Sequence, residues 1–246
     1  MTDEEITKLA PVDIDNPEAY EAAKNDKELF IKLRRNGFGA SDSSIILGVN
    51  PYEDLSNLLV KKMSTVVTTE ELAVGDKENV RKGADLEPLI LEKAEEFFNM
   101  EIYKPQAQYR LRACPQLTTN FDGIMNVCGM LIPVEAKYVS PFANKYWNRQ
   151  AAIDKPSDKG YMPPVVPIPD MKQYILKCAE KCGIPPYYYT QVQQQLLALN
   201  APFGYLAALF DKGWQLLVFK VYRDQNICDS LECKSAEAWK VIKGDQ

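Results

Sequence analysis

The most informative absence in this 246-residue sequence is histidine, which does not occur at all. Without histidine the chain cannot run a Ser-His-Asp or Cys-His mechanism, and it cannot build a histidine-ligated zinc site. Most hydrolase templates are thereby excluded. Carboxylate, carbonyl and water ligands remain, and these suit hard cations such as Mg²⁺, with Mn²⁺ as a substitute.

Features of membrane and secreted proteins are missing as well. No run of about 18 or more apolar residues occurs, so no membrane-spanning helix is expected. The N-terminal stretch MTDEEITKLAPVDID is acidic, unlike a secretory signal peptide, and the six cysteines are too scattered for a disulfide framework. We therefore expect a cytoplasmic protein with reduced thiols and no membrane partner.

What the chain does contain is enough apolar sequence for a large core. Hydrophobic residues make up 46% of the sequence, which favours one domain over residues 1–246. The net charge of -5 does not exclude a nucleic-acid partner, because steering depends on where the charges lie. Basic residues do cluster locally, at Lys32, Arg34 and Arg35, at Lys61 and Lys62, and at Arg81 and Lys82.

The hydrophobic periodicity predicts helices separated by a group of strands. Helices are expected over residues 16–35, 55–63, 79–99, 170–182, 190–200 and 226–243, with a short helix capped by Ser41 and a loop over residues 64–75. A meander is expected over residues 106–113, 117–125 and 129–139, and a hairpin over residues 204–224. Residues 141–189 read as a proline-rich insertion. This order indicates an α/β or α+β core with a central mixed sheet.

The stretch IPVEAKYVS, Ile132 to Ser140, places a glutamate and a lysine in an otherwise apolar strand. Alternate side chains of a strand share a face, so Glu135 and Lys137 stand together. Asp122 lies on the preceding expected strand, where a turn would bring it to Glu135. Two carboxylates can hold a divalent cation that activates water, and a nearby ammonium can orient that water or stabilise the developing charge. An isolated Glu-x-Lys pair is nevertheless common on solvated strands.

Four segments in order resemble the YqaJ-like and lambda-type phage exonucleases of the PD-(D/E)xK nuclease superfamily. They are GFGASDSSIILGVNPY with Arg34 upstream, GADLEPLI with Glu87, the Asp122, Glu135 and Lys137 set, and QVQQQLLALN with Gln191. Together they span residues 34 to about 200. The resemblance implies a restriction-endonuclease-like core, a central mixed β-sheet flanked by helices.

The resemblance also implies roles for individual residues. Asp122, Glu135 and the carbonyl of Ala136 would ligate Mg²⁺, Glu87 would support the metal or its water, and Lys137 would position the nucleophile. Gln191 would reach toward the active site from its helix.

Candidate DNA contacts come from the same segments. Arg34 is the candidate for a terminal 5′-phosphate, with Arg35 as the alternative if the register is shifted by one residue. Ser41 can offer its hydroxyl to a phosphate or cap a helix. Gln195, one turn from Gln191, can bind a nucleotide strand or cap a carboxylate.

The function implied by the resemblance is a Mg²⁺-dependent exodeoxyribonuclease. It would resect one strand of linear double-stranded DNA from its end, 5′ to 3′, for recombination by single-strand annealing. Expected partners are double-stranded DNA ends, a single-strand annealing protein and further copies in a ring-shaped homotrimer. The gene would belong to a phage or prophage, and the enzyme would act in the cytoplasm of a bacterial host.

Alternatives remain open at this point. They are an endonuclease or repair nuclease on the same core, a catalytically inactive DNA-end binding protein, and an interaction module with chance motifs. Asn120 and Phe121 depart from the small or polar residue and proline that the family often has before the motif aspartate. No iron–sulfur cluster is expected, because Cys178, Cys182, Cys228 and Cys233 lack the spacing of such sites.

Overall fold

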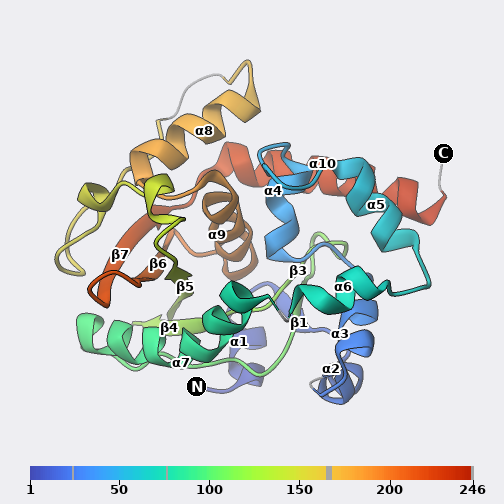
Figure 1. The fold of residues 1–246 in the computed structure, drawn as a ribbon, viewed down its shortest axis with the longest axis horizontal. Coiled ribbons are helices and arrows are strands. Elements are labelled where there is room, and N and C mark those ends of the chain that lie inside the picture. The colour runs from blue at the N-terminus through green and yellow to red at the C-terminus, as the bar shows by residue number, and fades with distance from the viewer. Residues whose placement is uncertain (24, 76, 165–167, 245–246) are drawn as a thin grey trace.

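The computed structural model describes residues 1–23, 25–75, 77–164 and 168–244 (Figure 1). Its helices are α1 (Asp3–Leu9), α2 (Pro17–Ala23), α3 (Lys27–Arg34), α4 (Ser43–Ile46), α5 (Leu55–Met63), α6 (Thr69–Val74), α7 (Glu78–Phe98), α8 (Met171–Cys182), α9 (Pro186–Leu199) and α10 (Gln225–Lys243). Its strands are β1 (Val12–Ile14), β2 (Tyr109–Leu111), β3 (Thr118–Thr119), β4 (Gly123–Val127), β5 (Met130–Val139), β6 (Phe203–Phe210) and β7 (Gln215–Tyr222). Short 3₁₀ helices cover Ala40–Asp42, Asn144–Tyr146 and Arg149–Ala151.

The central sheet is mixed, as the sequence predicts. Its strands lie in the order β4-β5-β6-β7, with antiparallel pairs at both ends and a parallel pair, β5 and β6, in the middle. The parallel pair requires a crossover, and the chain between β5 and β6 supplies it through α8 and α9. Strand β5 is therefore paired on both sides, which places its side chains in the middle of the molecule.

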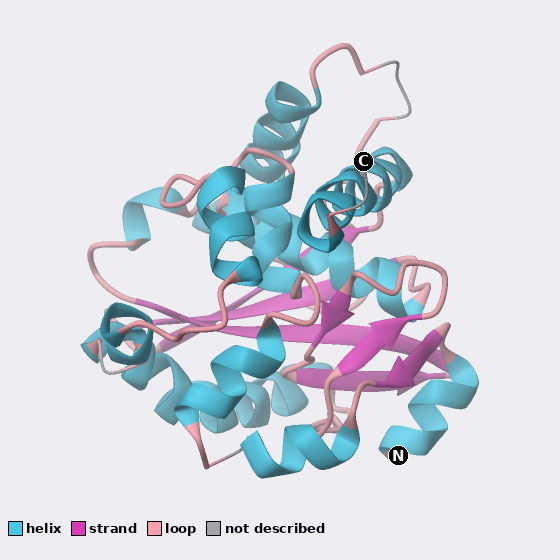
Figure 2. Ribbon diagram, turned by 90° about the vertical axis from the view of Figure 1, so that its right-hand side faces the viewer, coloured by secondary structure: helices cyan, strands magenta, loops and turns pink. Residues whose placement is uncertain are grey.

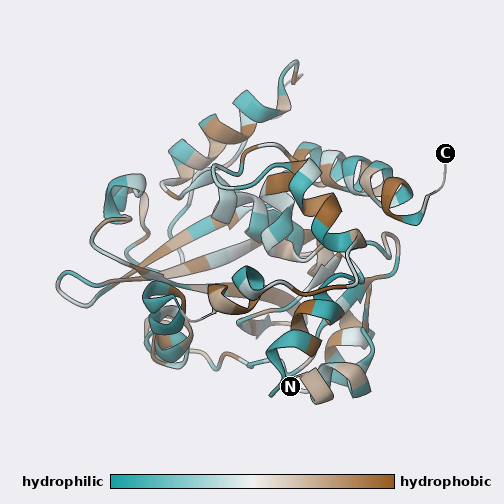
Figure 3. Cartoon of the chain, turned by 45° about the vertical axis from the view of Figure 1, so that its right-hand side comes forward, coloured by the Kyte–Doolittle hydropathy of each residue, from teal (hydrophilic) through white to brown (hydrophobic). Residues whose placement is uncertain are grey.

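Helices cover both faces of this sheet (Figure 2). Helix α7 packs against β5 and β6 through Ile90, Leu91, Ala94 and Phe98. Helix α9 packs on the same strands and is itself covered by α8, α10 and α4, so it is buried along most of its length. In Figure 3 the outer helices alternate between hydrophilic and hydrophobic segments, as amphipathic helices do. The sheet and α9 thus form the interior.

A proline lies inside the central strand without disturbing it. Pro133 is opposite Ile124 of β4, but the backbone N–H and C=O of Ile124 bond to Tyr103 instead. Pro133 therefore occupies a position whose missing N–H would face away from β4, and the pairing with β6 begins only at Val134. On that side the proline ring lies against Gly204, where a Cβ would come within 2.8 Å of it.

The expected meander is only partly right. The stretch 117–125 divides into β3 and β4, and these belong to different sheets. Strand β3 pairs with β2, and β2 with β1, whereas β4 pairs with β5. Asn120, Phe121 and Asp122 lie between the two sheets, so the chain changes direction immediately before β4 and Asp122 stands at the junction.

Other sequence-based predictions need local corrections. The helix expected over residues 16–35 is two helices, because Asp26 accepts a hydrogen bond from Leu29 N and starts α3 anew; residue 24 lies outside the described residues. The expected loop over residues 64–75 contains α6, started by a capping box between Thr68 and Glu71. Ser41 does not cap a helix; Asp42 instead accepts a hydrogen bond from Gly39 N.

The remaining helices and the hairpin agree with the expected ranges. Helix α5 has the expected bounds, α7 shifts by one residue at both termini, α8 and α10 shift by one residue at the start, and β6 and β7 form the expected hairpin. Helix α9 begins at Pro186, four residues before the expected start, because proline fits the first turn of a helix. None of the helices in the described part of the chain has the length and apolar character needed to cross a membrane.

Candidate active site

Glu135 and Lys137 stand together on the face of β5 that α9 covers. The Lys137 ammonium forms an ion pair with Oε1 of Glu135. Glu135 is 1% exposed, whereas the Lys137 side chain is 20% exposed, so the pair leads from the interior to the surface. The alternation of the strand predicted this arrangement. Tyr138, on the opposite face, instead bonds Asp211 at 2.8 Å.

Two glutamines of α9 complete the surroundings of the Glu135 carboxylate. Gln191 Nε2 donates to Oε1, and Gln195 Nε2 donates to Oε2 at 2.5 Å and to the carbonyl of Asn120 at 3.4 Å. The two glutamines lie one turn apart, so a single helical face reaches both oxygens. Donors to an ionised carboxylate offset the large cost of burying its charge. Gln191 therefore lies where the sequence expected it.

Gln195, expected as a DNA contact, lies beneath Glu135. It is 1% exposed, and its amide is directed at the Glu135 carboxylate. Of the two readings that the sequence left open, the carboxylate cap is the one that the geometry matches.

Asp122 reaches the same site from the junction before β4. Its Oδ2 accepts a hydrogen bond from the backbone N–H of Ala136 at 2.9 Å, which holds the carboxylate between Glu135 and Lys137 along β5. Burial and the nearby negative charge of Glu135 raise the pKa of Asp122 well above its usual range, although Lys137 works in the opposite direction. Two carboxylates thus share one partly buried space, and a cation is what would relieve their repulsion.

Glu87 approaches from α7 on the other side of the cluster. Burial, followed by the charge of Glu135, raises its pKa, so its carboxylate lies within electrostatic range of the site. A Cβ at Gly83 would meet no other atom within 4 Å. Within the described part of the chain no other segment packs closely on Gly83, so the space beside it is open to a ligand.

These residues fit a divalent cation that has few protein ligands. Among the described residues, no three cysteine, aspartate or glutamate side chains converge to hold a metal by themselves. Asp122 and Glu135 converge as a pair, and the backbone of Ala136 lies beside them. A site of two carboxylates, one carbonyl and water suits Mg²⁺, which keeps much of its water and prefers oxygen ligands.

Arg34 and Ser41 form a second polar group facing the same space. Arg34 Nη2 donates to Ser41 Oγ at 2.7 Å, which fixes the guanidinium at the end of α3. Both line one cleft of about 190 Å³ together with the carboxylates. The cleft, called the catalytic cleft below, is lined by Phe30, Arg34, Gly39, Ala40, Ser41, Gln108, Thr118, Asn120, Asp122, Glu135, Lys137 and Gln191. Residues of the first and the last motif segments therefore meet in the catalytic cleft.

Arg35, the alternative phosphate ligand, is directed elsewhere. Its guanidinium forms a two-pronged ion pair with Glu71 of α6 at 2.8 Å and donates to the carbonyls of Ser64 and Val66. It is 9% exposed. Arg35 thus ties α6 to α3, and Arg34 is the arginine that faces the cleft.

Sequence reasoning missed the structural role of Lys62. Its ammonium lies 2.7 Å from Asp42 Oδ2 and also donates to the carbonyls of Arg34 and Gly37, at 2.8 and 2.6 Å. These contacts fold the segment between Arg34 and Asp42 around one buried charge. The basic pair Lys61 and Lys62 gave no signal of this, because every partner lies at least 20 residues away.

Comparison with known proteins shows the family of the chain. The family model described as the YqaJ-like viral recombinase domain matches residues 29–200. The chain belongs to this family. The match contains every predicted site residue from Arg34 to Gln195, and it confirms the family that the motifs indicated. No curated protein sequence matches the chain.

Solved structures share the fold at low sequence identity. An alkaline exonuclease from Laribacter hongkongensis is 10% identical, with a TM-score of 0.58, and the match covers 93% of each chain. The same exonuclease in complex with dAMP matches with the same identity and TM-score over 87% of this chain and 92% of the other. The YqaJ-like protein thus has the expected restriction-endonuclease-like fold, in agreement with the predicted enzyme class, a DNA nuclease.

Proposed function

We propose that this YqaJ-like protein is a Mg²⁺-dependent exodeoxyribonuclease that resects one strand of linear double-stranded DNA, 5′ to 3′, for recombination by single-strand annealing. The observation that carries the proposal is the catalytic cleft, which joins the Asp122, Glu135 and Lys137 cluster to Arg34 and Ser41. One part suits hydrolysis of a phosphodiester, and the other suits recognition of a terminal phosphate.

Asp122, Glu135 and the Ala136 carbonyl are the proposed metal ligands, and Glu87 supports the metal or its water. Bound Mg²⁺ would lower the pKa of a water and neutralise charge on the phosphoryl oxygens. Gln191 holds Glu135 from α9 and faces the cleft, so it fixes the carboxylate on the side from which substrate enters.

Lys137 acts in this scheme as a cation. Burial tends to lower the pKa of its ammonium, but the charges of Glu135 and Asp122 outweigh that effect and raise it above the usual value. The side chain is therefore protonated at neutral pH. It can orient the attacking water and stabilise the negative charge that develops on the phosphate, but in this state it cannot accept a proton.

Arg34 would select the 5′ end. A guanidinium offers paired donors to a phosphate, and Ser41 keeps this one in place. A terminal phosphate has one more negative charge than an internal one, so a cation at a fixed distance from the scissile bond favours ends. The neighbouring alkaline exonuclease has been solved in complex with dAMP, a nucleotide with a 5′-phosphate, which supports this reading.

Further aspects of the proposal rest on the family alone. The protein would work as one nuclease domain over residues 1–246, beside a single-strand annealing protein and as a homotrimer around DNA. A phage or prophage gene would supply it in the bacterial cytoplasm.

The test is digestion of a linear duplex and its closed circular form, in Mg²⁺ and in EDTA. The expected result is Mg²⁺-dependent loss of the linear DNA alone, with mononucleotides released from the 5′ end. Lys137→Ala should abolish the loss, whereas Lys177→Ala, an exposed lysine of α8, should not. Cleavage of the circle would instead establish an endonuclease. Binding without cleavage would establish an inactive DNA-end binding protein.

A further inference from the structure

Tyrosine side chains from three separate parts of the chain gather beside the catalytic lysine. Tyr52 follows α4, Tyr146 lies in the insertion, and Tyr187 and Tyr188 lie in the first turn of α9. The rings of Tyr52 and Tyr187 are 5.9 Å apart between centroids, and those of Tyr187 and Tyr188 are 4.5 Å apart. We call Tyr52, Tyr146, Tyr187 and Tyr188 the tyrosine cluster.

The tyrosine cluster is joined to the active site by Tyr188. The ammonium of Lys137 lies over this ring, 5.3 Å from its centroid. Tyr188 also packs on Trp147, which is 8% exposed and anchored against Phe210 and Phe219. The base of the cluster is therefore fixed by the core, and its position next to Lys137 does not depend on a loose surface loop.

The outer members of the cluster are open to solvent. Tyr52 is 77% exposed and Tyr146 is 54% exposed, unlike the aromatic side chains that pack in the core. Burial, followed by the neighbouring hydroxyls of Tyr188 and Tyr52, raises the pKa of Tyr187, and Tyr146 adds to this effect. The rings of Tyr52, Tyr187 and Tyr188 thus lie close together with Tyr52 on the outside, and Tyr146 adjoins Trp147, whose ring packs on Tyr188.

A cation accompanies the exposed rings. Lys145 is exposed, and its ammonium lies 5.0 Å from the centroid of the Tyr146 ring. Flat aromatic surfaces beside a positive charge are what proteins use to hold unpaired nucleotides, because each base stacks on a ring while its phosphate is neutralised.

We propose that the tyrosine cluster is a stacking platform for unpaired bases of the DNA strand that enters or leaves the catalytic cleft. The occupant is single-stranded because internal bases of a duplex are stacked on both faces, and only the terminal pair has one face open to a protein ring. The proposal deepens the nuclease function and rests on it for the identity of the strand. It also gives the insertion a role, since Tyr146 and Lys145 both belong to it.

The test measures binding without cleavage. A fluorescent oligothymidylate is titrated with the protein in EDTA, and its anisotropy is followed. Tyr52→Ala and Tyr146→Ala should each weaken binding by about fivefold or more, since one base stacked on an aromatic side chain is worth roughly that factor at least. Tyr52→Phe and Tyr146→Phe should bind like the wild type, because they retain the ring. Tyr52→Leu and Tyr146→Leu should bind like the alanine variants.

Matched controls separate the platform from general effects. Trp214→Ala removes an equally exposed aromatic ring, 54% exposed at the β6–β7 turn, and should leave binding unchanged. Lys145→Gln should reduce the dependence of binding on salt by about one counterion. Thermal unfolding of each variant should match the wild type, since the outer rings are not buried.

The outcomes distinguish the platform from the nuclease. Binding within twofold of the wild type for the double variant Tyr52→Ala and Tyr146→Ala would overturn the platform, as would failure of the wild type to bind the oligonucleotide. Loss of binding in this variant while the wild type shows no Mg²⁺-dependent cleavage would support the platform and overturn the nuclease. The platform would also be overturned if the tyrosine cluster contributed more to the binding of intact duplex than to the binding of the single strand.

Discussion

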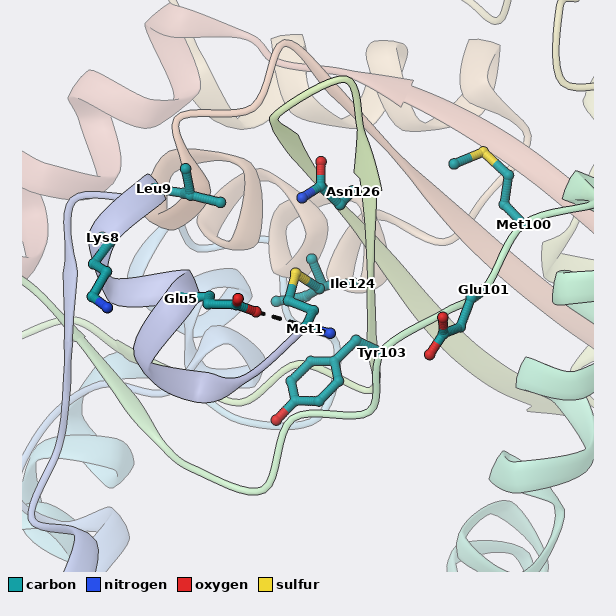
Figure 4. A pocket seen from close by; sticks show the side chains of 9 residues that line it. All are labelled: Met1, Glu5, Lys8, Leu9, Met100, Glu101, Tyr103, Ile124 and Asn126. Carbon is teal, nitrogen blue, oxygen red and sulfur yellow. Dashed lines mark ion pairs between the residues drawn. The ribbon is translucent and has the colours of Figure 1, made fainter.

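Two cavities flank strand β4, and they differ in size and in how their charged side chains are arranged. The catalytic cleft, of about 190 Å³, lies at the junction before β4. The other cavity, of about 530 Å³, opens between α1, the end of α7 and β4 itself (Figure 4). We call it the N-terminal cavity; its lining is Met1, Glu5, Lys8, Leu9, Met100, Glu101, Tyr103, Ile124 and Asn126. The larger cavity is the one without a catalytic arrangement.

The N-terminal cavity also contains charged and perturbed groups. Glu5 comes from α1 and Glu101 from the segment after α7, on different walls of the cavity (Figure 4). Glu5 accepts a hydrogen bond from Thr2 N and completes the capping box of α1. Burial and a hydrogen bond to Asp3 raise the pKa of Tyr103 to about 12, which keeps its hydroxyl protonated at neutral pH.

The comparison shows that convergence, and not volume, marks the site. In the catalytic cleft two carboxylates, an ammonium and a guanidinium face one small space. In the N-terminal cavity Glu5 and Glu101 lie on different walls, and Glu5 has a structural role in the capping box of α1. A perturbed pKa indicates function only when the perturbing partner is a group that the reaction could use.

The largest predicted difference between the two cavities concerns a single carboxylate. Glu135→Gln should reduce cleavage of linear duplex DNA by roughly 10³-fold or more, because a lost metal ligand removes several kcal/mol of transition-state stabilisation. Glu101→Gln, in the N-terminal cavity, should leave the rate within twofold. Initial cleavage rates at saturating Mg²⁺ measure both effects. Equal losses of rate in Glu135→Gln and Glu101→Gln would contradict the assignment of the catalytic cleft as the active site.

The next effect concerns the glutamine beneath Glu135. Gln195→Met preserves the volume but removes the donor at 2.5 Å from Oε2. We expect the free energy of unfolding to fall by about 1–3 kcal/mol, as for other hydrogen bonds to a charged group. Urea denaturation measures it, with Gln150→Met on the surface as the control. An unchanged midpoint would show that Gln195 does not stabilise the buried carboxylate.

A smaller effect should distinguish DNA ends. Arg34→Ala should lower kcat/KM on 5′-phosphorylated duplex by about tenfold, the loss of one charge-assisted contact, with little change on duplex that has a 5′-hydroxyl. Lys8→Ala, which removes a cation from the N-terminal cavity, should change neither rate. Equal losses on the two ends would assign Arg34 to general DNA binding, and no preference in the wild type would remove its role in end selection.

The smallest effect is a pH dependence of stability in the metal-free protein. The pKa of Asp122 is raised in the folded state, so that state keeps a proton which the unfolded chain loses from about pH 4 upward. The free energy of unfolding therefore falls as the pH rises from about 4 through the folded-state pKa of Asp122. In EDTA, Asp122→Asn should show less of this decline in Tm than the wild type, and Mg²⁺ should raise the Tm of the wild type alone. Parallel pH profiles would contradict the raised pKa.

The sequence predicted the site better than the path of the chain around it. The alternation in IPVEAKYVS predicted the Glu135 and Lys137 pair because a strand has a fixed period of two. The spacing of Gln191 and Gln195 placed both amides on one helical face for the same kind of reason. The meander failed at Thr119, because nothing local shows that the chain leaves one sheet there and enters another.

Sequence alone also could not decide between neighbouring residues. Arg34 and Arg35 have the same chemistry, and only the position of α6 directs one to Glu71 and leaves the other facing the cleft. Lys62 likewise became structural through partners at a distance in the chain.

By itself the sequence determined the chemistry available to this protein. It lacks histidine, which excludes whole classes of mechanism, and local periodicity fixed which face of its strand or helix Glu135, Lys137 and the two glutamines occupy. Tertiary structure alone decided which of those faces meet. The parallel pairing of β5 with β6 laid α9 over Glu135, and the junction between the sheets brought Asp122 to Ala136. Such contacts depend on packing between segments far apart in the chain, which no local pattern records.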